Sequence, residues 1–178
     1  MTAWVTDMPS PVGHGLAGIA AGWAVGRPAR STRALAVQTL TLAAIGMAPD
    51  LDLLWGRHSR ETHSIGAALV VASLAAWRRW PVGADTRGRI FATAAATWLI
   101  HPVLDVFSID NAEPIGVMLW WPFSAAFVHS PHAFFDPISR MWYSPDIWSH
   151  NALAAAHELM WLAPVALLVY LARRARPY

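Results

Sequence analysis

Six side chains of the kinds that bind metal ions stand at the ends of apolar segments of the sequence. These residues are His14, Asp50, Asp52, His63, His101 and Asp105. Proteins bind zinc, manganese and iron through histidine nitrogens and carboxylate oxygens. Ionisable groups near lipid are costly unless they are paired or bound to a metal ion. The set therefore predicts a polar, metal-binding site at one face of a helical bundle in a membrane.

His101 and Asp105 form an HxxxD pair inside the fourth apolar segment. A spacing of four residues places both side chains on one face of a helix. The pair could hold one ion, or it could form a histidine–carboxylate hydrogen bond that only satisfies two polar groups. By itself the pair favours neither interpretation.

Asp50 and Asp52 follow the second apolar segment in the string Pro49-Asp50-Leu51-Asp52. Carboxylates at a helix exit could bind a metal ion or act as a general base toward water. They could instead cap a short helix that begins at Pro49, because aspartate is common near helix N-termini. A functional role is favoured for Asp50, and both interpretations stay open for Asp52.

His63 and His14 each stand at the start of an apolar segment. His63 lies between Thr62 and Ser64, either of which could cap a helix, and it could bind a metal as a neutral ligand. A stripe of glycines follows His14 at four-residue spacing, which indicates close helix packing. The stripe consists of Gly18, Gly22 and Gly26.

Four further residues are candidates for the site. Glu158 lies inside the fifth apolar segment and needs a partner there, which a metal ion, His14 or an arginine could supply. His150 shares one side of that segment with Glu158. Arg57 and Arg60 lie upstream of His63 and could bind an anionic group of a substrate, or they could be solvated charges.

The composition points to a membrane protein. The chain has 178 residues, of which 56% are hydrophobic and 13% are charged, and its mean hydropathy is +0.36. Soluble domains usually have about a quarter charged residues. No cysteine is present, which excludes disulfides and thiolate metal sites. The length allows one domain, residues 1–178.

Five apolar segments predict an all-α integral membrane protein with about five transmembrane helices. The segments are residues 12–25, 34–48, 64–77, 90–107 and 152–172. Only the last two approach the ~20 residues that a helix needs to cross a bilayer core. The remaining three depend on the distribution of arginine for support.

All thirteen basic residues are arginines, and they alternate between loops. Ten lie between segments one and two, between three and four, or after five: Arg27, Arg30, Arg33, Arg78, Arg79, Arg87, Arg89, Arg173, Arg174 and Arg176. The other loops hold Arg57, Arg60 and Arg140. This asymmetry predicts a multi-pass protein of the bacterial inner membrane, with the N-terminus outside and the C-terminus in the cytoplasm. The scattered arginines form no patch that would suggest nucleic acid as a partner.

The topology brings the six candidates together. The first and third segments begin outside, and the second and fourth end outside, so all six residues reach the outer mouth of the bundle. Residues 108–149 are rich in proline and in aromatic residues such as Trp120, Trp121 and Trp142. Proline at this density prevents a long spanning helix, and aromatic rings suit the headgroup level. We expect an interfacial cap over the outer mouth.

The order of these motifs resembles the YdjM-like family of inner-membrane proteins, which are described as predicted metal-dependent hydrolases. The resemblance covers residues 14–124. It is carried by His14-x3-Gly18, Pro49-Asp50-Leu51-Asp52, Thr62-His63-Ser64, His101-x3-Asp105, and Gly116 followed by Leu-Trp-Trp-Pro-Phe-Ser124. It implies that the six residues form a metal site.

The ligand order is also similar, more distantly, to that of zinc-dependent phospholipase C, a helical phosphodiesterase. Those enzymes continue with an HxxxE motif, whereas this chain has Ala154 four residues before Glu158. The departure implies one or two ions, Zn²⁺ or Mn²⁺, in place of three.

The resemblance and the ligand chemistry together predict hydrolysis by a metal-activated water. His63, His101 and Asp105 would hold one ion, and His14 would lie near a second, with Asp52 or Glu158 as further ligands. Asp50 would be the general base or a bridging ligand. The substrate would be an ester or phosphodiester, either a membrane lipid or a small molecule, presented at the outer leaflet.

Two other classes of function remain open. A transporter of metal ions or small solutes would need polar residues at mid-membrane depth in several helices, and segments one and three show none. In a non-catalytic membrane protein, the six residues would form only a buried polar network.

Overall fold

The computed structural model describes residues 8–111, 113–139, 141 and 143–175. Arg140, Trp142 and Arg176, assigned above to loops and to the aromatic segment, lie outside these residues. Within the described part the chain forms α-helices and two short 3-10 helices, and its only β-structure is isolated bridges. The elements are α1 (Pro11–Val25), α2 (Thr32–Met47), η1 (Ala48–Trp55), η2 (Glu61–His63), α3 (Ile65–Arg78), α4 (Arg87–Val106) and α5 (Ile147–Arg174). The predicted all-α class is confirmed.

Hydroxyl side chains cap the starts of the first four α-helices. Each accepts a hydrogen bond from the backbone N–H three residues further on, which satisfies a donor that has no partner within the helix. The capping residues are Ser10, Ser31, Ser64 and Thr86. Ser64 thus caps α3 directly after His63, so this histidine lies just before the N-terminus of the helix.

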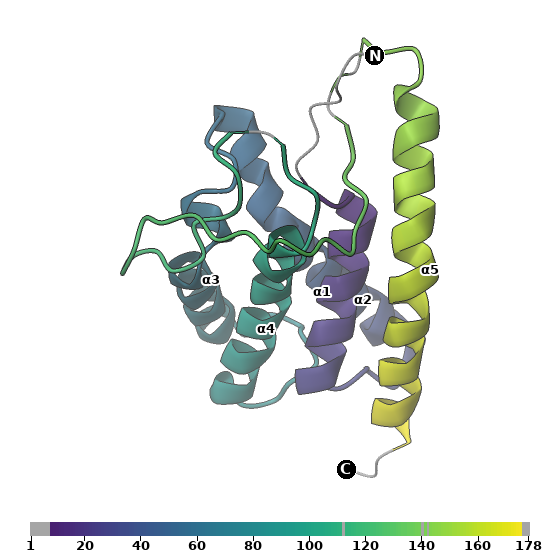
Figure 1. Ribbon diagram of the computed structural model, residues 1–178. Helices are drawn as coiled ribbons and strands as arrows, with labels where there is room; N and C mark the ends of the chain where they lie inside the picture. Colours follow the sequence, from purple (N-terminus) through teal and green to yellow (C-terminus); the bar gives the residue numbers. More distant parts are fainter. Residues whose placement is uncertain (1–7, 112, 140, 142, 176–178) are drawn as a thin grey trace.

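α1 and α4 form the centre of the bundle. α1 packs against α2, α4 and α5, and α4 packs against α1, α2 and α3 (Figure 1). Glycines allow α1 and α2 to approach closely: a Cβ on Gly18 would lie 2.9 Å from Gly46 Cα, and one on Gly46 would lie 2.7 Å from the carbonyl oxygen of His14. The glycine stripe therefore serves packing, and it brings the start of α1 next to the end of α2.

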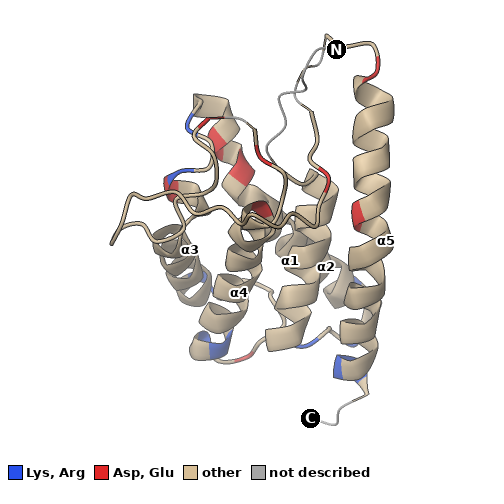
Figure 2. Cartoon of the chain, viewed as in Figure 1, with Lys and Arg blue, Asp and Glu red and all other residues tan. Residues whose placement is uncertain are grey.

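Charge is divided between the two ends of the bundle. Figure 2 shows most of the arginine positions at the end that carries the C-terminus, and most of the acidic positions at the opposite end. The candidate ligands lie at this acidic end, because α1 and α3 begin there and α2 and α4 end there (Figure 1).

Two stretches are long and apolar enough to cross a bilayer, Thr32–Trp55 and Ile147–Arg174. Large apolar side chains are exposed along the outer surface, including Leu40 (71%), Val70 (67%) and Leu168 (66%). Exposed apolar side chains on α2, α3 and α5 suit contact with lipid. The prediction of five spans, with the N-terminus outside, stays a prediction.

Residues 107–146 connect α4 to α5 and form the cap. In its described part the cap has no α-helix, and it crosses the acidic end of the bundle (Figure 1). Backbone hydrogen bonds from Ile65 and Gly66 to the carbonyls of Leu119 and Trp121, both 2.9 Å long, fix it to the first turn of α3. Trp120 (50%) and Phe123 (84%) are exposed on it, as an interfacial position would require.

Candidate metal centre

The structure brings together all six residues that the sequence singled out. His14 lies in the first turn of α1, Asp50 and Asp52 lie on η1, and His63 ends η2. His101 and Asp105 lie in the last turns of α4. The three histidines and Asp52 are fully buried, Asp105 is 3% exposed and Asp50 is 11% exposed.

Four atoms at the centre of this cluster have the spacing of ligands around one ion. His63 Nε2 lies 3.1 Å from His101 Nε2. Asp50 Oδ1 lies 3.6 and 3.2 Å from these two nitrogens, and Asp105 Oδ2 lies 3.5 and 3.3 Å from them. Around a tetrahedral ion with bonds of about 2.0–2.2 Å, adjacent ligand atoms lie roughly 3.3–3.6 Å apart. These five distances among the four atoms therefore fit a zinc-type site.

Each of the two histidines makes its hydrogen bonds through Nδ1, which leaves a lone pair on the Nε2 atom that faces the centre of the cluster. His101 Nδ1 donates to the carbonyl oxygen of Gly46 at 2.7 Å, and His63 Nδ1 lies 3.2 Å from Asp52 Oδ2. In the neutral rings both Nε2 atoms then carry lone pairs that face each other at 3.1 Å. This contact is repulsive unless a cation or a proton lies between them.

The two central carboxylates increase the negative charge of the cluster. Neither oxygen of Asp50 or of Asp105 accepts a hydrogen bond from the residues that the structure describes, although all four oxygens are buried. Buried carboxylates without hydrogen bonds are costly unless a cation compensates them. A divalent ion would satisfy the carboxylates and the two histidine nitrogens together.

His14 extends the cluster on the side of α1. Its Nε2 lies 3.2 Å from Asp105 Oδ1, and its ring stacks on that of His101 with centroids 3.6 Å apart. His14, His101 and Asp105 thus form a second group of potential ligand atoms. His101 has only one nitrogen to offer, so a second ion would have to share Asp105 and rely on His14.

Asp52 lies beside Nδ1 of His63, so it does not face the central Nε2 atoms. It accepts a hydrogen bond from Thr62 Oγ1, its Oδ2 lies 3.2 Å from His63 Nδ1, and its Oδ1 lies 2.9 Å from Nδ1 of His58. Burial favours the neutral form of His63, but the carboxylates of Asp50 and Asp52 outweigh this and raise its pKa above the ordinary value. Asp52 is placed to orient a ligand, as carboxylates behind metal-binding histidines do.

His58 was not predicted from the sequence, although it completes a third group of potential ligands with Asp52 and His63. It lies in the turn between η1 and η2 and is 11% exposed. The available signal was a second histidine within twelve residues of Asp52, in the same connecting loop as His63.

Glu158 and His150 lie apart from the cluster. Glu158 is buried and accepts hydrogen bonds from the backbone N–H of Ser10, at 2.6 Å, and from the Ser10 hydroxyl. His150 Nε2 lies 3.1 Å from the carbonyl oxygen of Pro137 in the cap. Among the described residues, no group of potential ligands contains either one.

The two candidate substrate-binding arginines lie on the loop around η2. Arg57 forms an ion pair with Glu61, and both side chains are exposed. The guanidinium of Arg60 lies 5.8 Å from the ring centroid of Phe127 in the cap. Both residues belong to the segment that carries His58 and His63, and their role toward a substrate stays a prediction.

Replacing Asp52 with asparagine is expected to weaken metal binding by roughly 10–100-fold, because the neutral amide no longer holds the Nδ1–H of His63. The affinity can be measured by competition with a chelating dye. Asp136→Asn is the matched control, because Asp136 accepts from His157 Nδ1 at 2.8 Å in a similar pair on the surface. Equal affinities in the two variants would show that Asp52 does not support the site.

One comparison with known proteins gives a match. No curated protein and no solved structure matches the chain significantly. The sequence model of one family, described as "YdjM inner membrane protein", matches residues 8–176, which is nearly the whole chain and includes every candidate ligand. Because this match covers nearly the whole chain, the chain belongs to the YdjM inner membrane protein family.

Proposed function

We propose that the protein is a membrane-bound, metal-dependent hydrolase that acts on an ester or phosphodiester of a lipid. The observation that carries the proposal is the approach of His63 Nε2 and His101 Nε2 to 3.1 Å, with the carboxylates of Asp50 and Asp105 beside them. A metal ion between the two nitrogens would use both lone pairs, whereas a purely structural network would need one of the two rings to be protonated.

His63, His101, Asp50 and Asp105 would hold the ion, and His14 would support it through Asp105. A bound Zn²⁺ or Mn²⁺ would supply Lewis acidity and would activate water as a nucleophile at neutral pH. Gly46 and Asp52 fix the two histidine rings by their Nδ1 atoms, so the ligands are oriented before an ion binds.

Asp50 is the residue best placed to move a proton. Its Oδ1 faces the two histidines, which leaves Oδ2 for the proton of a reacting water. Asp50 is also the most exposed of the central ligands, at 11%, so substrate would enter from its side. This assigns to Asp50 both the ligand role and the base role that the sequence left open.

The surroundings of this entrance support a lipid-type substrate. On η1 the side chains of Leu51 (55%), Leu54 (81%) and Trp55 (56%) are exposed next to Asp50. They offer an apolar approach that suits acyl chains and the membrane interface. Arg57 and Arg60 on the following loop would bind the phosphate of a phosphodiester.

Hydrolysis by the purified protein tests the proposal. Loaded with Zn²⁺ or Mn²⁺, the wild type is expected to cleave a phospholipid or lipid ester, and a chelator is expected to abolish cleavage reversibly. Asp50→Asn should lower the rate by roughly 10²-fold or more at saturating metal, whereas Asp136→Asn, outside the cluster, should not.

Equal rates in the two variants would remove Asp50 from the mechanism. If the loaded protein cleaves no ester or phosphodiester but carries metal ions into vesicles, the hydrolase proposal fails and a transporter replaces it.

A further inference from the structure

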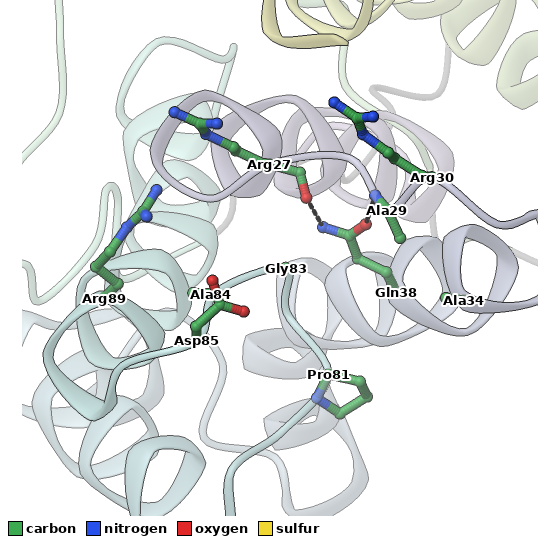
Figure 3. A pocket seen from close by; sticks show the side chains of 10 residues that line it. All are labelled: Arg27, Ala29, Arg30, Ala34, Gln38, Pro81, Gly83, Ala84, Asp85 and Arg89. Carbon is green, nitrogen blue, oxygen red and sulfur yellow. Dashed lines mark hydrogen bonds between the residues drawn. The ribbon is translucent and has the colours of Figure 1, made fainter. Parts of the chain in front are cut away.

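A crevice begins at the arginine-rich end of the bundle, opposite to the end that carries the metal centre. Its polar part is a cavity of about 420 Å³ between the α1–α2 loop and the α3–α4 loop (Figure 3). Three guanidinium groups and one carboxylate line it. They belong to Arg27, Arg30, Arg89 and Asp85.

The walls of this cavity are fixed by the buried side chain of Gln38. Its Oε1 accepts from the backbone N–H of Ala29 at 2.8 Å, and its Nε2 donates to the carbonyls of Arg27 (2.8 Å) and Val82 (3.2 Å). Figure 3 shows the bonds to Arg27 and Ala29. One side chain thus ties α2 to both loops.

Gly83 completes this junction. Its φ of +82° is unfavourable for other residues, and a Cβ on it would lie 1.9 Å from Gln38 Nε2. The carbonyl of Gly83 accepts from the backbone N–H of Arg27 at 2.9 Å. The α1–α2 loop is held from α5 as well, because Arg173 donates to the carbonyl of Gly26 at 2.6 Å. The cavity is therefore preformed.

Membrane topology alone does not account for this arrangement. A topological signal requires positive charge in a loop but no shaped cavity. Here three arginines and one aspartate line a fixed polar hollow. Guanidinium groups bind phosphate oxygens with two parallel hydrogen bonds each, so the hollow suits a phosphate group.

An apolar groove of about 540 Å³ continues from the polar cavity, and Pro81 lines both. One face of α2 runs along the two in turn. The residues at spacings of three and four are Ala34, Gln38, Thr41 and Ile45 on α2, and Ala48 at the start of η1. This face is about 21 Å long at 1.5 Å per residue. Val71 of α3 and Trp98 of α4 line the groove from the other helices.

We propose that this crevice binds an anionic phospholipid. The phosphate lies among Arg27, Arg30 and Arg89, and an acyl chain lies along α2 in the apolar groove. Trp80 lines the groove beside Pro81, the residue that the two regions share, and an aromatic ring there suits the glycerol level. The polar and apolar parts of one crevice thus match the two parts of one amphipathic ligand.

Native mass spectrometry tests this proposal. It measures the binding of phosphatidylglycerol to the delipidated full chain in detergent. Arg27→Ala/Arg89→Ala should bind the lipid roughly tenfold or more weakly, because charge-assisted hydrogen bonds are lost. Arg33→Ala/Arg87→Ala removes the same charge outside the cavity and should bind like the wild type. Arg89→Ala alone, at an exposed position, should show the same direction if the double variant fails to fold.

A second pair of variants tests whether the apolar groove binds the acyl chain. Ala44 lines the groove and Ala36 does not, and both are exposed on α2. Ala44→Trp should weaken lipid binding, and Ala36→Trp should leave it unchanged. Metal content at the opposite end should stay at the wild-type level in all variants, so this test is independent of the hydrolase proposal.

Three outcomes would overturn the proposal. The first is equal binding by the two double variants, which would reduce the arginines to a topological signal. The second is equal binding of zwitterionic phosphatidylcholine. The third is binding of inorganic phosphate with no effect of Ala44→Trp, which would make the cavity a site for a soluble anion.

Discussion

Replacing both His101 and Asp105 with alanine is expected to abolish metal binding. The double variant removes two of the four central ligand atoms and leaves His14 without Asp105, its 3.2 Å partner. The two remaining ligands, His63 and Asp50, cannot close a tetrahedral site. Metal per chain, measured by mass spectrometry after purification in detergent, should fall from one or two ions to none.

His150→Ala is the matched control for this experiment, because His150 lies in the cap-facing part of α5 outside every group of potential ligands. It should retain the wild-type metal content. Metal bound at full stoichiometry in His101→Ala/Asp105→Ala would refute the assigned site. A wild type that binds no Zn²⁺ or Mn²⁺ would leave a polar packing network and would end the enzyme proposal.

Replacing Glu158 with alanine is expected to destabilise the protein by about 3 kcal/mol while sparing the metal site. The buried carboxylate accepts two hydrogen bonds from Ser10, and its loss leaves the buried N–H and hydroxyl of Ser10 without an acceptor. Thermal unfolding in detergent should therefore begin at a lower temperature. The folded variant should still bind the wild-type amount of metal.

His157→Ala is the control for Glu158→Ala, because His157 is the preceding residue of α5 and pairs with Asp136 at the surface. Surface changes of this kind usually alter stability by less than about 0.5 kcal/mol. Loss of metal from Glu158→Ala with unchanged thermal stability would contradict this assignment and would place Glu158 in the metal centre.

The convergence of the six ligands could be predicted because helices in a bundle alternate in direction. His14 begins one apolar segment and Asp50 follows another, and direction alone decides which ends meet. The pair His101 and Asp105 then needed only the helical spacing. The identity of the central atoms could not be predicted, since it depends on hydrogen bonds to Gly46 and Asp52 behind the rings.

The position of His58 and the partner of Glu158 could not be predicted from the sequence, for a different reason. His58 returns to Asp52 because the chain turns back through Gly56 and Ser59, whose φ angles are +68° and +63°. No apolar periodicity marks such a turn. Glu158 was expected to need a partner, but that partner proved to be the N–H and hydroxyl at the start of α1, which no residue pattern distinguishes.

For the number of transmembrane helices, the arginine pattern and the helix lengths give different predictions. α1 and α3 have 15 and 14 residues, so each is roughly 21–23 Å long, shorter than the ~30 Å hydrocarbon core. The arginine pattern favours a span for each helix, whereas length does not. The structure therefore identifies two candidate spans and leaves the path of the shorter helices to a topology measurement.

The order of synthesis gives the last helix a distinct place in the biogenesis of the protein. Every central ligand precedes residue 106, whereas α5 begins at Ile147 and bonds to Ser10, at the start of α1, through Glu158. Because N-terminal segments leave the ribosome first, the nascent chain carries a full set of ligands before α5 exists. The hydrogen bonds between Ser10 and Glu158 of α5 can therefore form only after all the metal-binding residues have been made.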